Sequence, residues 1–293
     1  MVTTKVKIVT DSTAYLTPEE IARYDVHVVP LKVIFGTDVY SEGVNITTEE
    51  FYRRLTKART LPTTSLPSKS DFVKVYRELA QRGHPILSIH ISSKLSGTVN
   101  SAIAARDDLP QAQIEVVDSL SVAQKMLIAP AAKAARKGQP LSQLKASVDK
   151  LNACISAVGA FSTLEYLWKG GRIGVAKALL GTMLRITPVL AFERGETKVL
   201  AKTRTVGKAL DYILELMRGR VKAGTPIHVA VVHTHAIEPA LTLKKEVAAN
   251  FNCAELELIE LGPVLATHIG PGFFGLGFYS DCLLYTSEPT RPY

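Results

Sequence analysis

The stretch that decides the fold reads Pro85-Ile86-Leu87-Ser88-Ile89-His90-Ile91-Ser92-Ser93-Lys94-Leu95-Ser96-Gly97-Thr98. Its beginning is largely apolar, as in a buried strand, and its polar remainder leads into a helical pattern over residues 99–107. Similar strand-like runs at residues 5–10 and 114–117 are also followed by helical patterns. Because strands that alternate with helices pair in parallel, the first half of the chain predicts a parallel sheet with helices on both faces.

Polar turns follow each of these predicted strands. They are Asp11-Ser12-Thr13, residues 92–98 and Asp118-Ser119. In a parallel sheet the ligand crevice lies beyond the carboxyl ends of the strands, so we expect a binding site among these turns. The helix start after Gly97 offers unpaired amides to an anionic head group, and Ser96 adds a hydroxyl. Capping statistics alone favour a plain N-cap role for Ser96, so both interpretations stay open.

The pattern changes near Ile155. Strands are predicted at residues 155–163, 187–192, 227–233 and 254–261, and helices at residues 206–223 and 239–250. The turn Arg194-Gly195-Glu196 predicts a hairpin into a further strand. The fold class is therefore α/β, with an N-terminal parallel-sheet α/β domain at residues 1–155 and a C-terminal α+β domain at residues 156–281. Residues 26–35 predict one further buried strand in the first domain.

The last twelve residues, 282–293, are expected to be a non-native tail. Cys282-Leu-Leu-Tyr-Thr-Ser287 is what one reading frame of a common sequencing-library transposon end encodes. The natural sequence is therefore expected to stop near Asp281, and Cys282 takes no part in functional reasoning.

Composition narrows the class of protein. The chain has 293 residues, of which 46% are hydrophobic, so it can bury a large core without disulfides. Its three scattered cysteines, the lack of a signal pattern and the lack of a bilayer-length apolar run predict a cytoplasmic protein. The net charge of +8 fits nucleic acid, an anionic membrane surface or an acidic protein as partner, or it serves solubility alone.

Three other motifs are weaker signals. Residues 169–174, Lys-Gly-Gly-Arg-Ile-Gly, can bind phosphate but do not form a Walker A motif. Residues 270–275 match the dinucleotide pattern G-x-G-x-x-G, yet too little chain follows for the required helix and strand, so we expect a tight turn beside a ligand. His233 and His235 lack further metal ligands at the right spacing, so no metal site is predicted.

Two alternative functions follow from single features. A Ser-dependent lipid or ester hydrolase would combine Ser96, His268 and an aspartate such as Asp11, although the chain lacks a G-x-S-x-G elbow. A nucleic-acid-binding regulator would use the positive charge in salt-sensitive binding.

Together the motifs resemble the DegV family, the bacterial fatty-acid-binding proteins, from Lys5 to about Tyr279. The landmarks are residues 9–14 (Val-Thr-Asp-Ser-Thr-Ala), 29–31 (Val-Pro-Leu), 51–52 (Phe-Tyr), 64–68 (Thr-Ser-Leu-Pro-Ser), 92–98, 117–119 (Val-Asp-Ser), 169–173 and 268–272 (His-Ile-Gly-Pro-Gly).

The resemblance implies a carrier and no enzyme. It implies that one long-chain fatty acid lies in a tunnel between the two domains, with its carboxylate on Thr64 and Ser96 and with Gly97 and His268 close by. It also implies that the carrier hands the acid to a separate fatty acid kinase, which makes an acyl phosphate for phospholipid metabolism. Arg172 and Arg204 are the implied kinase-docking positions.

The resemblance implies no catalytic residue, no metal, no cofactor besides the bound acid and no nucleic acid partner, and a transient contact with a membrane surface stays open. Two departures from the family pattern concern the tunnel. Residues 123–126 read Ala-Gln-Lys-Met where the family usually has glycines, which predicts a narrower or reshaped tunnel. Phe273-Phe274 stand where the family usually has a small residue, and they are expected to cap the pocket or to shift the ligand.

Overall fold

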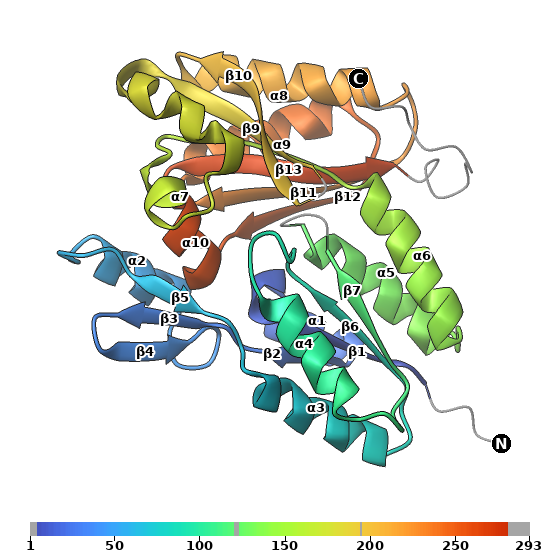
Figure 1. The fold of residues 1–293 in the computed structure, drawn as a ribbon. Helices are drawn as coiled ribbons and strands as arrows, with labels where there is room; N and C mark the ends of the chain where they lie inside the picture. The colour runs from blue at the N-terminus through green and yellow to red at the C-terminus, as the bar shows by residue number, and fades with distance from the viewer. Residues whose placement is uncertain (1–4, 120–122, 194, 281–293) are drawn as a thin grey trace.

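The computed structural model describes residues 5–119, 123–193 and 195–280, without the side chains of residues 180–185 (Figure 1). The predicted tail, residues 282–293, lies outside these residues. No helix in the described ranges is both long and apolar enough to cross a membrane.

The predicted parallel sheet is present in the first half of the chain. Its strand order is β2-β1-β6-β7, and all three neighbouring pairs are parallel. The strands are β1 (Lys7–Asp11), β2 (Val26–Val29), β6 (Ile86–His90) and β7 (Ile114–Asp118). The helices around this sheet are α1 (Pro18–Tyr24), α3 (Lys69–Gln81), α4 (Thr98–Asp107), α5 (Lys125–Arg136) and α6 (Leu141–Cys154).

Side-chain alternation along the strands explains why helices cover both faces of this sheet. Ile8 and Leu87 pack with the helices α5 and α6, whereas their neighbours Val9 and Ile86 pack with α3 and α4. Successive residues of a strand point to opposite faces, so a strand that is apolar at every position needs cover on both. The short apolar runs of the sequence thus define a doubly covered sheet.

The predicted single strand over residues 26–35 is wrong. It is two strands in different sheets, because β2 ends at Val29 and β3 (Lys32–Phe35) pairs antiparallel with β4 (Asp38–Ser41) and β5 (Thr63–Ser65). Pro30 lies at the break and has no N–H group to continue a ladder. Helix α2 (Thr48–Leu55) packs on this three-stranded sheet through Phe51. The sheet matters for function because β5 carries Thr64.

The second half of the chain forms a mixed sheet of six strands in the order β10-β9-β8-β13-β11-β12. Only β11 and β12 pair in parallel; the other neighbours are antiparallel. Helices α8 and α9 cover one face, and the other face looks toward the parallel sheet (Figure 1). The elements are β8 (Ser156–Ala160), β9 (Thr187–Glu193), β10 (Glu196–Thr203), α8 (Val206–Arg220), β11 (Ile227–Thr234), α9 (Ile237–Asn250), β12 (Cys253–Glu260) and β13 (Phe273–Ser280).

The sequence interpretation of residues 270–275 misses β13, a central strand whose eight residues are all buried. Gly270 and Gly272 do form a turn with positive φ, but the run then continues as a strand. Gly275 sits so close to β8 that a Cβ there would lie 2.4 Å from the carbonyl oxygen of Val158. The close contact explains why a glycine stands at this position of a strand. Because glycine is depleted in strands in general, the composition of this segment did not predict β13.

Four further elements lie between or beside the two large sheets. They are the 3-10 helix η1 (Ser12–Ala14), helix α7 (Glu165–Lys169) with the 3-10 segment η2 (Gly174–Arg185), and helix α10 (Pro263–Ile269). Helix α10 lies between the three-stranded sheet and the six-stranded sheet (Figure 1), and all of its residues except His268 are buried. The division of the chain into domains at residues 155 and 156 stays a prediction.

Candidate functional site

Three residues that the sequence singled out line one hollow, which we call the head chamber. Thr64 comes from β5, Ser96 from the loop before α4 and His268 from α10, and they share the hollow with Arg172 and Phe192. The Thr64 Oγ1 atom lies 2.7 Å from Nε2 of His268. The volume of the head chamber is about 50 Å³. Segments far apart in the sequence thus bring hydroxyl and imidazole groups together.

Ser96 is not the N-cap residue of α4, but its hydroxyl accepts a hydrogen bond from the backbone N–H of Thr98, the first residue of the helix, at 3.4 Å. The N-cap of the helix is Gly97, without a side-chain hydrogen bond, and the Ser96 Oγ atom lies 2.8 Å from Oγ1 of Thr98. The N-cap position predicted for Ser96 is therefore wrong by one residue, although its hydroxyl does bind the first N–H group of the helix. Gly97 does not line the head chamber; a Cβ at Gly97 would lie 3.0 Å from a methyl carbon of Leu66, so glycine lets the loop after β5 approach α4.

His268 is held as a neutral ring. Burial lowers its pKa to about 4, and the positive charge of Arg172 adds to the effect. Its Nδ1 atom is buried and has no hydrogen-bond partner among the described residues. A Cβ at Gly170, the residue that follows α7, would lie 2.5 Å from this Nδ1 atom, so only glycine leaves room for the ring. A neutral imidazole beside Thr64 can exchange donor and acceptor roles with the hydroxyl.

The two predicted docking arginines have different surroundings. Arg172 follows Gly171, which has a φ of 73°, and its guanidinium donates to the carbonyl oxygens of Gly170 at 2.6 Å and Leu95 at 3.2 Å. It therefore forms part of the head chamber wall. Arg204 is exposed, follows β10 and lines none of the hollows described here. Trp168 on α7 is 50% exposed and precedes this wall by only a few residues.

A buried carboxyl group that the sequence did not reveal fixes the start of α10. Glu42 accepts hydrogen bonds from the backbone N–H of Val264 at 2.7 Å and from the Ser12 hydroxyl at 2.6 Å. Burial raises the pKa of Glu42 to about 7, although the donors Ser12 and Val264 oppose the rise. Gly262 is needed here, because a Cβ would lie 2.6 Å from the Tyr15 ring. Glu42 thus positions the helix that carries His268.

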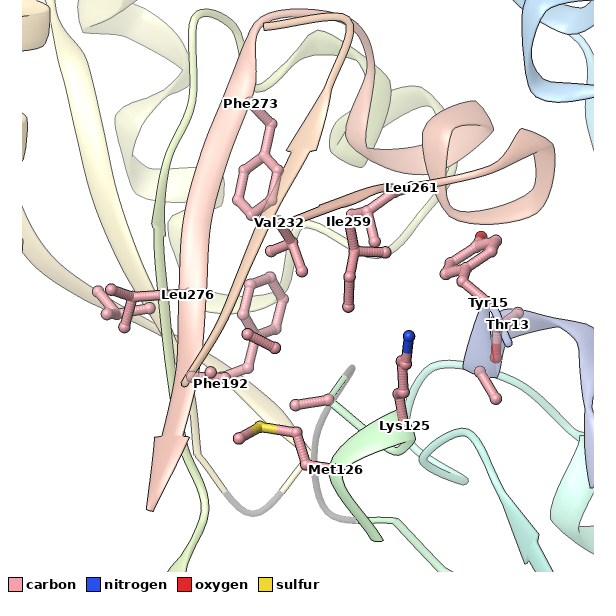
Figure 2. A pocket seen from close by; sticks show the side chains of 16 residues that line it. Thr13, Tyr15, Lys125, Met126, Phe192, Val232, Ile259, Leu261, Phe273 and Leu276 are labelled. Carbon is pink, nitrogen blue, oxygen red and sulfur yellow. The ribbon is translucent and has the colours of Figure 1, made fainter. Parts of the chain in front are cut away.

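A second hollow, which we call the apolar pocket, lies between the two large sheets (Figure 2). Phe192 lines both this pocket and the head chamber, so its ring separates them. The volume of the apolar pocket is about 30 Å³, which is room for about two water molecules. Side chains on its wall include Tyr15, Lys125, Met126, Phe192, Val232, Ile259, Leu261 and Phe273.

Both departures from the family pattern bear on the apolar pocket. Ala123, Lys125 and Met126 lie on its wall, as does Phe273. Phe274 points the other way and packs in the core under α8 and α9. Only Phe273 is therefore placed to cap the pocket.

The catalytic triad of the hydrolase alternative is not assembled. Ser96 contacts Thr98, His268 contacts Thr64, and the Asp11 Oδ2 atom lies 3.0 Å from Nδ1 of His90. The other ring nitrogen of His90, Nε2, lies 2.6 Å from the Ser88 hydroxyl, so Ser88, His90 and Asp11 do form a hydrogen-bonded chain. All three side chains are completely buried, so a substrate cannot reach them. They form a structural network of the parallel sheet.

The histidines after β11 do not form a metal site in the described part of the chain. No group of three or more histidine, cysteine, aspartate or glutamate side chains within the described ranges is arranged to hold an ion. His233 is buried, and the ring of His235 packs 5.1 Å from that of Tyr52.

The fold and the site define a class of protein. An apolar pocket between two sheets, with hydroxyl and imidazole groups beyond one end, suits an amphipathic ligand that has a chain and a polar head. The chain belongs to the DegV family, because the model of this family, described as uncharacterised protein, matches residues 5–281.

Relatives of known sequence and structure agree with the family. A DegV domain-containing protein of Halalkalibacterium halodurans is 35% identical over 95% of this chain and 99% of its own length. A fatty-acid-binding DegV protein of Thermus thermophilus superposes with a TM-score of 0.89 at 35% identity, over 94% of this chain and 99% of its own. A stearic-acid-binding protein of Eubacterium ventriosum gives 0.85 at 30% identity, over 94% and 98%.

Proposed function

We propose that the chain binds one long-chain fatty acid between its two large sheets and presents the carboxylate to a separate fatty acid kinase, which forms the acyl phosphate. The carrying observation is that Phe192 lines both the head chamber and the apolar pocket. A single ligand that passes this ring puts its head at Thr64 and Ser96 and its chain among apolar side chains. The relatives that bind fatty acids and share this fold support the proposal.

The energetics of the two hollows fit an amphipathic acid. Each buried methylene contributes about 0.8 kcal/mol, so the apolar pocket supplies most of the affinity. The carboxylate keeps hydrogen-bond partners if it accepts from the hydroxyls of Thr64 and Ser96. The negative charge of the carboxylate makes these hydrogen bonds stronger than bonds between neutral groups. No buried cation is needed, and the head group stays within reach of a phosphoryl donor. Because the volume of the pocket is small, the side chains on its wall have to move as the ligand binds. The Phe192 side chain, which lies between the two hollows, has to move most.

The proposed role is that of a carrier without its own catalysis, metal or cofactor. In this proposal the kinase approaches over Arg172, which borders the head chamber, and over Arg204. The same proposal keeps residues 1–155 and 156–281 as the two domains that enclose the acid. It also places the protein in the cytoplasm, with a transient membrane contact during loading.

Native mass spectrometry of the purified protein, followed by denaturing extraction, tests fatty-acid binding directly. The expected result is a single bound species with the mass of a long-chain fatty acid, which dissociates on denaturation. A protein that is empty and also takes up no added oleate or palmitate would contradict the proposal.

A coupled assay tests the kinase partner separately. The loaded protein, a fatty acid kinase and ATP should give acyl phosphate, which hydroxylamine traps as a hydroxamate. Arg204→Ala should lower this rate while fatty-acid affinity stays unchanged, because Arg204 lines neither hollow. Lys244→Ala, at a residue of α9 on the opposite face of the six-stranded sheet, is the matched control. Equal rates for Arg204→Ala and the control would remove Arg204 from the docking surface.

A further inference from the structure

We propose that Met126, packed on Gly277, sets the longest acyl chain that the pocket accepts. This inference rests on the proposed function, because it concerns the far end of the same pocket. The head chamber fixes one end of the ligand at Thr64 and Ser96. A fixed obstacle at the other end then measures chain length.

Met126 stands at a boundary between two hollows. It lines the apolar pocket, and it also lines a third hollow beyond it, which we call the rim hollow, together with Lys125 and Ala230. In Figure 2 the Met126 side chain extends from α5 toward the strands of the six-stranded sheet. The apolar pocket therefore ends where the thioether begins, just as it ends at Phe192 on the side of the head chamber.

Gly277 on β13 is what lets Met126 take this place. A Cβ at Gly277 would lie 3.0 Å from the Met126 Sδ atom and 3.0 Å from the Cβ of Ala123. Those distances are shorter than ordinary van der Waals contact, so even a methyl group would push the start of α5 or the thioether into the pocket. The glycine and the methionine thus act as one steric unit.

The rim hollow beyond Met126 contains ion pairs as well as apolar side chains. The Lys125 ammonium lies 2.9 Å from the carboxylate of Glu20 and 3.1 Å from that of Glu257, and its side chain is only 15% exposed. Glu255 of the same hollow pairs with His228 at 3.0 Å and with Lys133 at 3.3 Å. An acyl chain that reached these ion pairs would displace their water without forming hydrogen bonds. These ion pairs therefore add to the steric barrier that Met126 forms.

Dissociation constants for the saturated acids from lauric to arachidic acid test the inference in three variants. Met126→Ala removes the thioether, so the optimum should move by two methylenes toward longer acids. The acid two carbons beyond the wild-type optimum should bind about tenfold more tightly than it does to the wild type, at about 0.8 kcal/mol per methylene and tenfold per 1.4 kcal/mol. Gly277→Ala should move the optimum toward shorter acids, and Met126→Leu, which keeps the volume, should leave it in place.

The outcomes separate the two proposals. A wild type that binds none of these acids would refute the proposed function itself. A wild type that binds them, with an unchanged optimum in Met126→Ala, would refute only the role of Met126. The double variant Met126→Ala/Gly277→Ala should return toward the wild-type optimum, because the two changes act on one space. Circular dichroism and a thermal melt show whether each variant is folded. If either Met126→Ala or Gly277→Ala is not folded, the remaining single variant still tests the proposal.

Discussion

The two ends of the apolar pocket are built in different ways. At the head chamber, backbone turns and hydrogen bonds hold Thr64, Ser96 and His268, and Gly170 at the end of α7 lets the histidine ring fit closely. At the far end, Met126 packs against Gly277, and Lys125 forms ion pairs that bridge α1 and β12. The first end is specified by polar chemistry and depends on several chain segments at once. The second is specified by volume, so single substitutions should retune it.

Removal of both head-chamber hydroxyls should give the largest effect. Thr64→Val combined with Ser96→Ala takes away the two proposed hydrogen bonds to the carboxylate, each worth about 1.5–3 kcal/mol. Fatty-acid affinity should fall by about 100-fold or more, measured by calorimetric titration. The fatty acid methyl ester is the control ligand, and its affinity should change far less. An equal loss for acid and ester would mean that the variant damages the pocket and not the carboxylate contact.

Substitution of Glu42 should change the stability of the fold, and the change should depend on pH. Burial raises the pKa of Glu42 from 4.5 to about 7, so the folded chain holds this proton more tightly than the unfolded chain. The stability that Glu42 contributes is therefore complete below about pH 4.5 and is lost as the pH rises through about 7.

Glu42→Gln removes this titration. Relative to the wild type it should gain up to about 3 kcal/mol of unfolding free energy between pH 5 and pH 8, since one pKa unit is worth about 1.4 kcal/mol. Urea unfolding at several pH values measures the difference. Glu215→Gln, at an exposed carboxyl of α8, is the control and should show no such trend. Parallel pH profiles for the wild type and Glu42→Gln would contradict the assignment.

Loss of the ion pairs at the far end should have the smallest effect. Lys125→Met keeps the apolar stem of the side chain and removes its contacts with Glu20 and Glu257. Partly exposed ion pairs contribute about 0.2–1 kcal/mol each, so the loss of both should quicken release of a fluorescent fatty acid by about 2-fold to 30-fold. In the wild type, high salt should quicken release in the same way, and in the variant salt should have little effect. A loss as large as that of the hydroxyl pair would overturn the distinction between the two ends.

The parts of the molecule that the sequence revealed are those with local patterns. Alternating apolar strands and helices predicted the parallel sheet, and the motifs around Thr64, Ser96 and His268 led to residues that meet in one chamber. The break at Pro30 had a local signal as well, which the apolar run around it obscured.

The parts that the sequence did not reveal depend on distant partners. Glu42 binds Ser12 and Val264, which lie 30 and 222 positions away, so no local pattern marks it. The strand β13 is rich in glycine because neighbouring strands and α5 approach it closely, and only the folded chain shows those neighbours. Met126 was visible only as a departure from a family pattern, and its role follows from its packing on Gly277.

The exposed indole of Trp168 provides an optical signal that needs no label. It is the only tryptophan of the chain, half exposed on α7, and it directly follows Leu167 on the wall of the head chamber. In the proposed complex, a kinase that reaches the carboxylate past Arg172 would cover this helix and remove water from the indole. The emission maximum should then move to shorter wavelength, so complex formation can be followed in real time by intrinsic fluorescence with a kinase variant that lacks tryptophan.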